Sequence, residues 1–246
     1  MYGLQLDLLA GLLGLTPAQA RAAANRWRAL GYADCARIGP GRSWVWLTRR
    51  GLTACGLRYT AAAPPLARLA HLRAVAVARL ALESAPSYQR SGAHWRSERR
   101  LRARMGGRVG LREHLPDGEI HFPDGAGFPD GAGFPDDTGL LDGAGLTFSG
   151  ECWAVEAELS PKTVTRTAAI MRELLTRTGD YGGPAAQATV PGRPARHTRV
   201  LYLCSAAARP AVTRAAGQLG ALAHRVEIRG LPAAVAFEEA PEGRTA

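Results

Sequence analysis

The chain has almost no lysine. Lys162 is the only lysine among its 31 basic residues, and all the others are arginine. A composition rich in Ala, Arg and Gly is typical of a GC-rich genome, which encodes arginine in preference to lysine wherever a positive charge is sufficient. Lysine offers a compact ammonium with an adjustable pKa, and the planar, permanently charged guanidinium does not. Lys162 is therefore a candidate for chemistry, with chance survival of one surface lysine as the plain alternative.

Long apolar runs and paired cysteines are also lacking. No run approaches the ~20 apolar residues that span a bilayer, and the N-terminus lacks a basic start followed by an apolar core. We therefore expect a cytoplasmic protein without a membrane partner. The cysteines contain no C-x-x-C pair, which argues against a zinc ribbon or a disulfide framework. They are Cys35, Cys55, Cys152 and Cys204.

The charge balance favours a polyanionic partner. The 246 residues carry a formal net charge of +10 and a pI of about 10.3, and 46% of them are hydrophobic. Such a chain can build one large domain or two small ones. Double-stranded DNA is the leading partner, and an anionic membrane surface ranks below it.

The first 60 residues predict two helices and a hairpin. Residues 2–13 have a helical pattern, and Thr16 begins a capping box that opens a second helix ending near Leu30. Two strand-like runs, 35–38 and 43–47, follow around a Gly-Pro-Gly turn.

This arrangement resembles a winged helix-turn-helix, whose second helix enters the DNA major groove while the wing touches the backbone. A winged helix that only contacts proteins is the alternative. The residues expected to face DNA are Arg21, Asn25, Arg28, Arg37 and Arg42.

Residues 61–92 form a predicted linker and bridging helix. The Ala-rich helical pattern over 66–83 could connect two domains or pair with a second copy in a homodimer.

The stretch from Cys152 to Lys162 organises the second half of the chain. Large apolar residues alternate with Glu156 and Glu158, which predicts a strand that presents both carboxylates on one face. Ser160 suits a helix N-cap, so Lys162 is expected in the first turn of the next helix, near the two acids.

Two further acids precede this strand. Glu98 falls on the apolar stripe of a helix predicted over 95–105, where a carboxylate needs an ion pair or a metal. Asp117 follows a proline at a predicted strand, between His114 and His121, which we expect to be solvated or hydrogen-bonded rather than ligands. The arginines that could pair with Glu98 are Arg96, Arg99, Arg102 and Arg104.

Six-residue Phe-Pro-Asp-Gly repeats occupy residues 122–145 and predict an expanded loop. Calcium-binding acidic turns are the functional alternative, but the spacing matches neither an EF-hand nor a Gly-Gly-x-Gly-x-Asp repeat. The copies leave open whether Asp124 or Asp130 replaces Asp117. A β-α-β pattern after residue 199 completes an α/β domain over 93–232 with a central mixed sheet, and 233–246 is a tail.

These residues suggest hydrolysis of a phosphodiester. Asp117 and Glu156 would hold Mg²⁺ or Mn²⁺, and Glu98 would complete the shell directly or through water. Lys162 would orient the attacking water or stabilise the developing charge, with Glu158 as a further acid.

An acid on a helix, Pro-Asp at a strand and an acidic strand running to a lysine resemble the PD-(D/E)XK nuclease fold. The layout of the chain is similar to the actinobacterial plasmid replication-relaxation family. The resemblance implies a protein of a plasmid or mobile element that binds and nicks or relaxes DNA. The nuclease pattern expects lysine where this chain has Glu158, so Lys162 must reach back from the next helix.

Three functions are compatible with these sequence patterns. The first is a metal-dependent endonuclease or nickase. The second is a non-catalytic DNA-binding regulator with a degenerate nuclease-like domain. The third is a protein-interaction adaptor.

Overall fold

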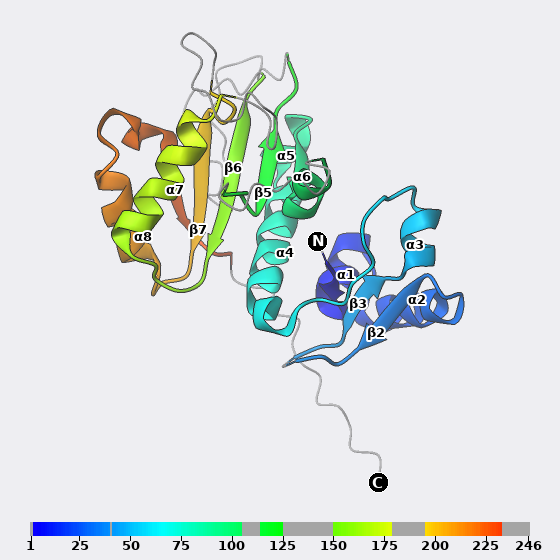
Figure 1. Cartoon of the computed structure of the whole chain (residues 1–246). Helices are drawn as coiled ribbons and strands as arrows, with labels where there is room; N and C mark the ends of the chain where they lie inside the picture. The colour runs from blue at the N-terminus through cyan, green and yellow to red at the C-terminus, as the bar shows by residue number, and fades with distance from the viewer. Residues whose placement is uncertain (1, 40, 105–113, 125–149, 179–194, 233–246) are drawn as a thin grey trace.

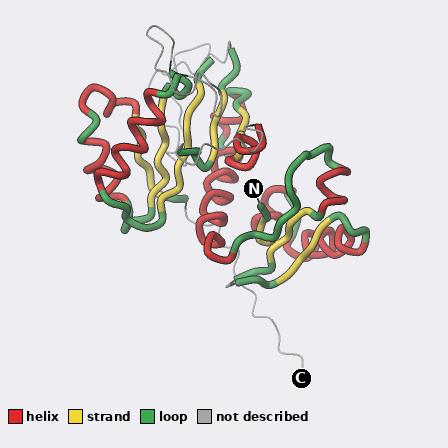
Figure 2. Tube along the Cα trace, viewed as in Figure 1, coloured by secondary structure: helices red, strands yellow, loops and turns green. Residues whose placement is uncertain are grey.

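The structure is a computed structural model that describes residues 2–39, 41–104, 114–124, 150–178 and 195–232. Within these ranges the fold is mixed α/β, with a 3-stranded sheet in the N-terminal unit and a 5-stranded sheet in the larger unit (Figures 1 and 2). None of the helices in the described ranges is long and apolar enough to cross a membrane.

The elements in chain order are β1 (Leu4–Gln5), α1 (Leu6–Leu13), α2 (Pro17–Ala29), β2 (Ala33–Ala36), β3 (Trp44–Leu47), α3 (Arg49–Ala54), η1 (Leu66–Arg68), α4 (Leu69–Ser84), α5 (Pro86–Arg90), β4 (His94–Ser97), α6 (Glu98–Arg104), β5 (Gly118–His121), β6 (Cys152–Glu158), α7 (Val164–Thr176), β7 (Arg199–Cys204), α8 (Arg209–Gly217), η3 (Gly220–Arg225) and β8 (Val226–Gly230).

The N-terminal unit packs α1 and α2 beside an antiparallel sheet of order β1-β3-β2. The predicted capping box of α2 is confirmed. The Thr16 hydroxyl accepts a hydrogen bond from the backbone N–H of Gln19, and the Gln19 side-chain oxygen accepts one from the backbone N–H of Thr16. The first helix begins later than predicted, at Leu6 instead of residue 2. The residues before it pair with β3, whose backbone groups would otherwise lack partners on that edge.

The larger sheet has the order β4-β5-β6-β7-β8. Its first three strands run antiparallel, and β6-β7 and β7-β8 pair in parallel. One face packs against α4 and α5 through residues such as Leu82 and Trp153, and the other packs against α7 and α8 through residues such as Met171 and Tyr202 (Figure 1). The predicted mixed sheet is therefore confirmed.

The predicted helix over 95–105 is wrong at its start. Residues 94–97 form β4, which pairs with β5 along its whole length, and the helix begins only at Glu98. Trp95 packs over the adjacent strand so closely that a Cβ added at Gly118 would lie 2.0 Å from its ring. Glycine after Asp117 is therefore a packing requirement of this sheet.

The helix after β6 also begins later than predicted. Its N-cap is Thr163 instead of Ser160. The Thr163 hydroxyl accepts a hydrogen bond from the backbone N–H of Arg166. Lys162 consequently lies in the connection that precedes α7, outside its first turn.

Helix α4 contacts both units. Leu69 and Leu72 pack against Trp44 of the N-terminal sheet, while Val75 and Leu82 lie in the core of the larger sheet. Two hydrogen bonds of 3.1 and 2.7 Å from Arg73 to Asp7 add a bidentate ion pair between α4 and α1. The part of α4 that carries Leu69, Leu72 and Arg73 is thus covered by the N-terminal unit of the same chain.

Candidate functional site

Strand register places Asp117 and Glu156 side by side. Gly118 pairs with Val155, so the two acids are the next residues on antiparallel neighbours β5 and β6. Both are buried, and the Ala157 amide of β6 donates to Asp117 Oδ2 over 2.9 Å. Buried carboxylates are costly unless they are paired. Their environment therefore determines what they can do.

Each of these acids has a histidine partner. His71 Nε2 of α4 lies 2.7 Å from Asp117 Oδ1, and His114 Nε2 lies 2.7 Å from Glu156 Oε1. The hydrogen bond to Asp117 outweighs burial and raises the pKa of His71. Burial lowers the pKa of His114, but the hydrogen bond and the charge of Glu156 together raise it. The expectation of a hydrogen-bonded His114 is confirmed, and His71 was missed because it lies on a different element.

Glu156 is the acid whose protonation is most altered. Burial, with the charge of Asp117 adding to it, raises its pKa to about 7, while His114 and Lys162 oppose the rise. Glu156 is therefore close to its protonation midpoint at neutral pH, and a nearby cation would favour its charged form.

Lys162 reaches back to the acidic strand. Its Nζ lies 2.6 Å from Glu158 Oε2, and its charge also acts on Glu156. Tyr202 pairs with Glu156 across β6 and β7, and burial together with both glutamates raises its pKa well above the ordinary value. The ammonium and three acids thus lie near the ends of β5 and β6.

Glu98 is close to Asp117 but is neutralised by arginines. Its backbone amide donates to the Asp117 carbonyl oxygen over 3.1 Å. Its two carboxylate oxygens lie 3.0 Å from Arg68 and 2.6 Å from Arg102. Burial raises the pKa of Glu98, but the two arginines lower it overall. The sequence allowed Glu98 to be either an ion-pair partner or a metal ligand. The ion pair is present, and Arg68 joins the expected partner Arg102.

The two repeat acids that could replace Asp117 are Asp124, which the structure describes, and Asp130, which it does not. Asp124 lies beyond the end of β5 that is opposite to Asp117. Asp130 and the remaining repeat copies, like residues 233–246, lie outside the described residues.

The donor set around Asp117 suits a hard divalent cation in chemistry. Asp117 and Glu156 offer carboxylate oxygens, which Mg²⁺ and Mn²⁺ prefer. A cation held there would compete with His71 and His114 for these oxygens. Glu98 fits less well as a ligand because Arg68 and Arg102 place two positive charges against its one negative charge.

A second polar group lies further along the same strands. Ligand atoms of Glu119, Cys152 and His197 all lie within 4.8 Å of one another, and among the described residues no other group of this kind is found. This group could hold a metal ion. The pattern was missed because it joins residues from three segments of the chain.

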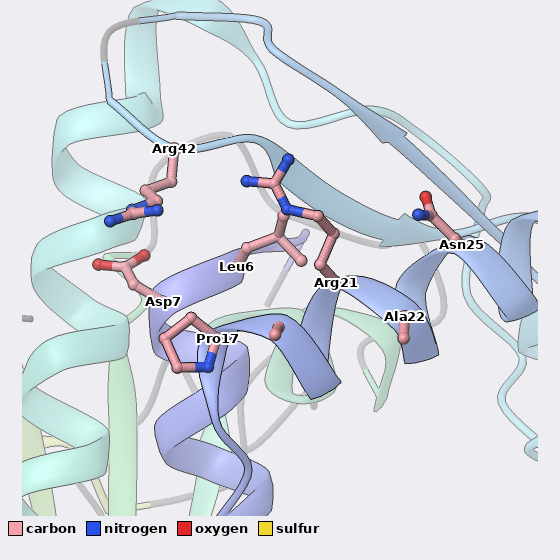
Figure 3. A pocket seen from close by; sticks show the side chains of 8 residues that line it. Leu6, Asp7, Pro17, Arg21, Ala22, Asn25 and Arg42 are labelled. Atoms are coloured by element: carbon pink, nitrogen blue, oxygen red, sulfur yellow. The ribbon is translucent and has the colours of Figure 1, made fainter. Parts of the chain in front are cut away.

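The N-terminal unit carries a pocket beside α2. Arg21 and Asn25 of α2 line it together with Arg42 of the β2–β3 connection (Figure 3). The carboxylate of Asp7 points toward Arg42 from α1 (Figure 3). Three of the five residues expected to face DNA thus share one hollow. The other two, Arg28 and Arg37, are exposed and do not line it.

Comparisons with known proteins give no relative. No family model, curated protein or solved structure matches the chain.

Proposed function

We propose that this chain is a DNA-binding protein of a plasmid or mobile element that nicks DNA by metal-dependent phosphodiester cleavage. The observation that carries the proposal is the side-by-side placement of Asp117 and Glu156, with Lys162 held beside them by Glu158. The net charge of +10 and the pocket lined by Arg21 and Arg42 support a nucleic-acid substrate.

The residues divide the chemistry between them. Asp117 and Glu156 would hold Mg²⁺ or Mn²⁺, which supplies charge neutralisation and an acidic water when bound. Lys162 is the one ammonium at this place and would donate hydrogen bonds to the scissile phosphate. His71 and His114, whose pKa values are raised by these carboxylates, hold the carboxylates in position and can act as proton donors or acceptors.

The N-terminal unit would bind the DNA. It resembles a winged helix in that helices α1 and α2 precede the β2–β3 hairpin, which pairs with β1, and α2 would take the place of the recognition helix. Arg21, Asn25 and Arg28 would face the groove, while Arg37 and Arg42 would lie near phosphates.

A non-catalytic DNA-binding function is the second candidate, and a specific observation favours it. Glu98 is neutralised by Arg68 and Arg102, and glutamate occupies position 158, where a nuclease of this type has lysine. This alternative requires DNA binding that is independent of metal and leaves both strands intact.

DNA binding is tested by fluorescence anisotropy on a labelled duplex at several salt concentrations. Arg21→Ala and Arg42→Ala should each weaken binding. Arg42→Ala should also reduce the slope of log K against log salt by about 1, because it removes a phosphate contact. Arg90→Ala, an exposed arginine of the larger unit, is the matched control and should bind like the parent chain. Equal affinity and slope in all four proteins would contradict an N-terminal DNA site.

A further inference from the structure

Four potential metal ligands converge away from the acid pair. Glu119 and His121 are two residues apart on β5 and share a face, and Cys152 of β6 pairs directly with His121. His197 lies just before β7. His121 Nε2 lies 2.8 Å from Glu119 Oε2 and 3.5 Å from Cys152 Sγ, and His197 Nε2 lies 2.9 Å from Glu119 Oε1.

The tautomer of His197 is fixed by the helix behind it. Its Nδ1 lies 3.1 Å from the carbonyl oxygen of Leu174 in α7, and a carbonyl oxygen only accepts, so Nδ1 carries a proton. Nε2 then faces the Glu119 carboxylate either as the second N–H of an imidazolium or as a lone pair directed at a cation. A ring whose other nitrogen donates to a backbone carbonyl is the usual arrangement of a metal-ligating histidine.

Arg196 orients the carboxylate and leaves it able to bind further partners. Its Nε and Nη2 lie 2.8 and 3.0 Å from the two Glu119 oxygens. A carboxylate oxygen accepts two hydrogen bonds, so each oxygen keeps a lone pair on the side of the histidines. Burial would raise the pKa of Glu119, but His121, His197 and Arg196 together lower it, and the carboxylate is anionic.

We propose that Glu119, His121, Cys152 and His197 form a structural zinc site. Thiolate, imidazole and carboxylate are the zinc ligands of proteins, and four of them leave no open position. Zinc–ligand bonds of 2.0–2.3 Å set tetrahedral ligand atoms about 3.3–3.6 Å apart. The 3.5 Å between His121 and Cys152 matches that spacing, and the 2.8 and 2.9 Å from the histidines to Glu119 are shorter than it. Ligand atoms of Glu119, Cys152 and His197 lie within 4.8 Å of one another, so binding would require small side-chain movements around the ion. Binding releases the Cys152 thiol proton to solvent.

The site would fasten three segments together. Glu119 and His197 are completely buried, so the ion would be enclosed, as structural sites are. It would tie β5 and β6 to the segment that enters β7, at the end of β5 opposite to Asp117. Its thiolate and imidazole donors favour zinc over the hard cations that suit Asp117 and Glu156.

The test is metal analysis of the full chain purified without a metal-affinity tag, followed by exchange with Co²⁺. We expect about one zinc per chain and a thiolate-to-cobalt charge-transfer absorption. Cys152→Ser should abolish this absorption. Cys55→Ser, which alters an exposed cysteine, and Asp117→Asn, which alters the acid pair, should both retain it.

His121→Gln keeps the test decisive if Cys152→Ser does not fold. The His121 side chain is partly exposed, and its loss should weaken zinc binding at least about tenfold in a folded protein. His224→Gln, at an exposed histidine, is the control. Absence of both zinc and the cobalt band in the parent chain overturns the proposal, as does a band that survives in Cys152→Ser or unchanged affinity in His121→Gln.

Discussion

At the scale of single residues, the acids of the larger unit differ in which basic groups compensate their negative charge. Glu98 is held by two arginines, Glu158 by Lys162, and Asp117 and Glu156 each by one histidine. Guanidinium and ammonium groups stay charged at neutral pH, whereas the charge of a histidine depends on pH. The acid pair is therefore the part of the cluster where charge is least fully compensated, which is where a cation would stabilise it most.

The raised pKa of Glu156 predicts a stability that falls as pH rises. The unfolded carboxyl loses its proton near pH 4.5 and the folded one near pH 7, so the folded state binds more protons between these values. His114, whose folded pKa is also raised, loses its contribution as pH rises through that pKa. In chelator the free energy of unfolding should drop over this window, by on the order of 3 kcal/mol at most. Urea unfolding at successive pH values measures it.

Glu156→Gln should flatten this dependence, because the amide does not titrate and His114 loses its charged partner. Glu83→Gln, in a partly exposed ion pair with Arg79, is the control and should keep the parent slope. A Glu156→Gln profile with the same slope as the parent chain would show that the titration belongs to other groups.

At the scale of elements, the sequence predicts those features that depend on neighbouring residues. The alternation that places Glu156 and Glu158 together and the capping box at Thr16 are local patterns, and both are present. The spacing of Trp95, Glu98 and Leu101 predicts a helix that includes residues 95–97, but pairing with β5 makes these residues a strand.

The candidate site was only partly predictable for the same reason. The approach of His71 to Asp117 spans 46 positions and that of His197 to Glu119 spans 78. Such contacts depend on how helices and strands pack, which no pattern along the chain contains.

The start of α7 gives a prediction at this scale. Thr163 caps the helix with its hydroxyl, while the Ser160 side chain is exposed in the preceding turn. Thr163→Ala should therefore lower the free energy of unfolding by about 1 kcal/mol. Ser160→Ala should change it by less than about 0.5 kcal/mol. Chemical denaturation of the two variants decides between the two caps, and a larger loss in Ser160→Ala would place the helix start where the sequence suggested.

At the scale of the whole molecule, α4 connects the two proposed activities. One end packs on Trp44 of the N-terminal sheet, and His71 near that end contacts Asp117. The helix lies between the N-terminal unit and the larger sheet (Figure 1). It thus connects the unit that carries the pocket of Arg21 and Arg42 to the unit that carries the acid pair. DNA held by the first unit would be presented to the second by a packed helix.

The most direct test is the rate of nicking of supercoiled plasmid against protein concentration, with Mg²⁺, with Mn²⁺ and with chelator. The parent chain should nick only with metal. Asp117→Asn and Lys162→Ala should bind plasmid but lose nicking, by about 100-fold or more. An Arg21→Ala/Arg42→Ala double variant should need more protein to reach the same maximal rate, and Glu83→Gln should match the parent chain. Plasmid that is shifted on the gel yet stays supercoiled under every condition would contradict cleavage and leave the non-catalytic DNA-binding function.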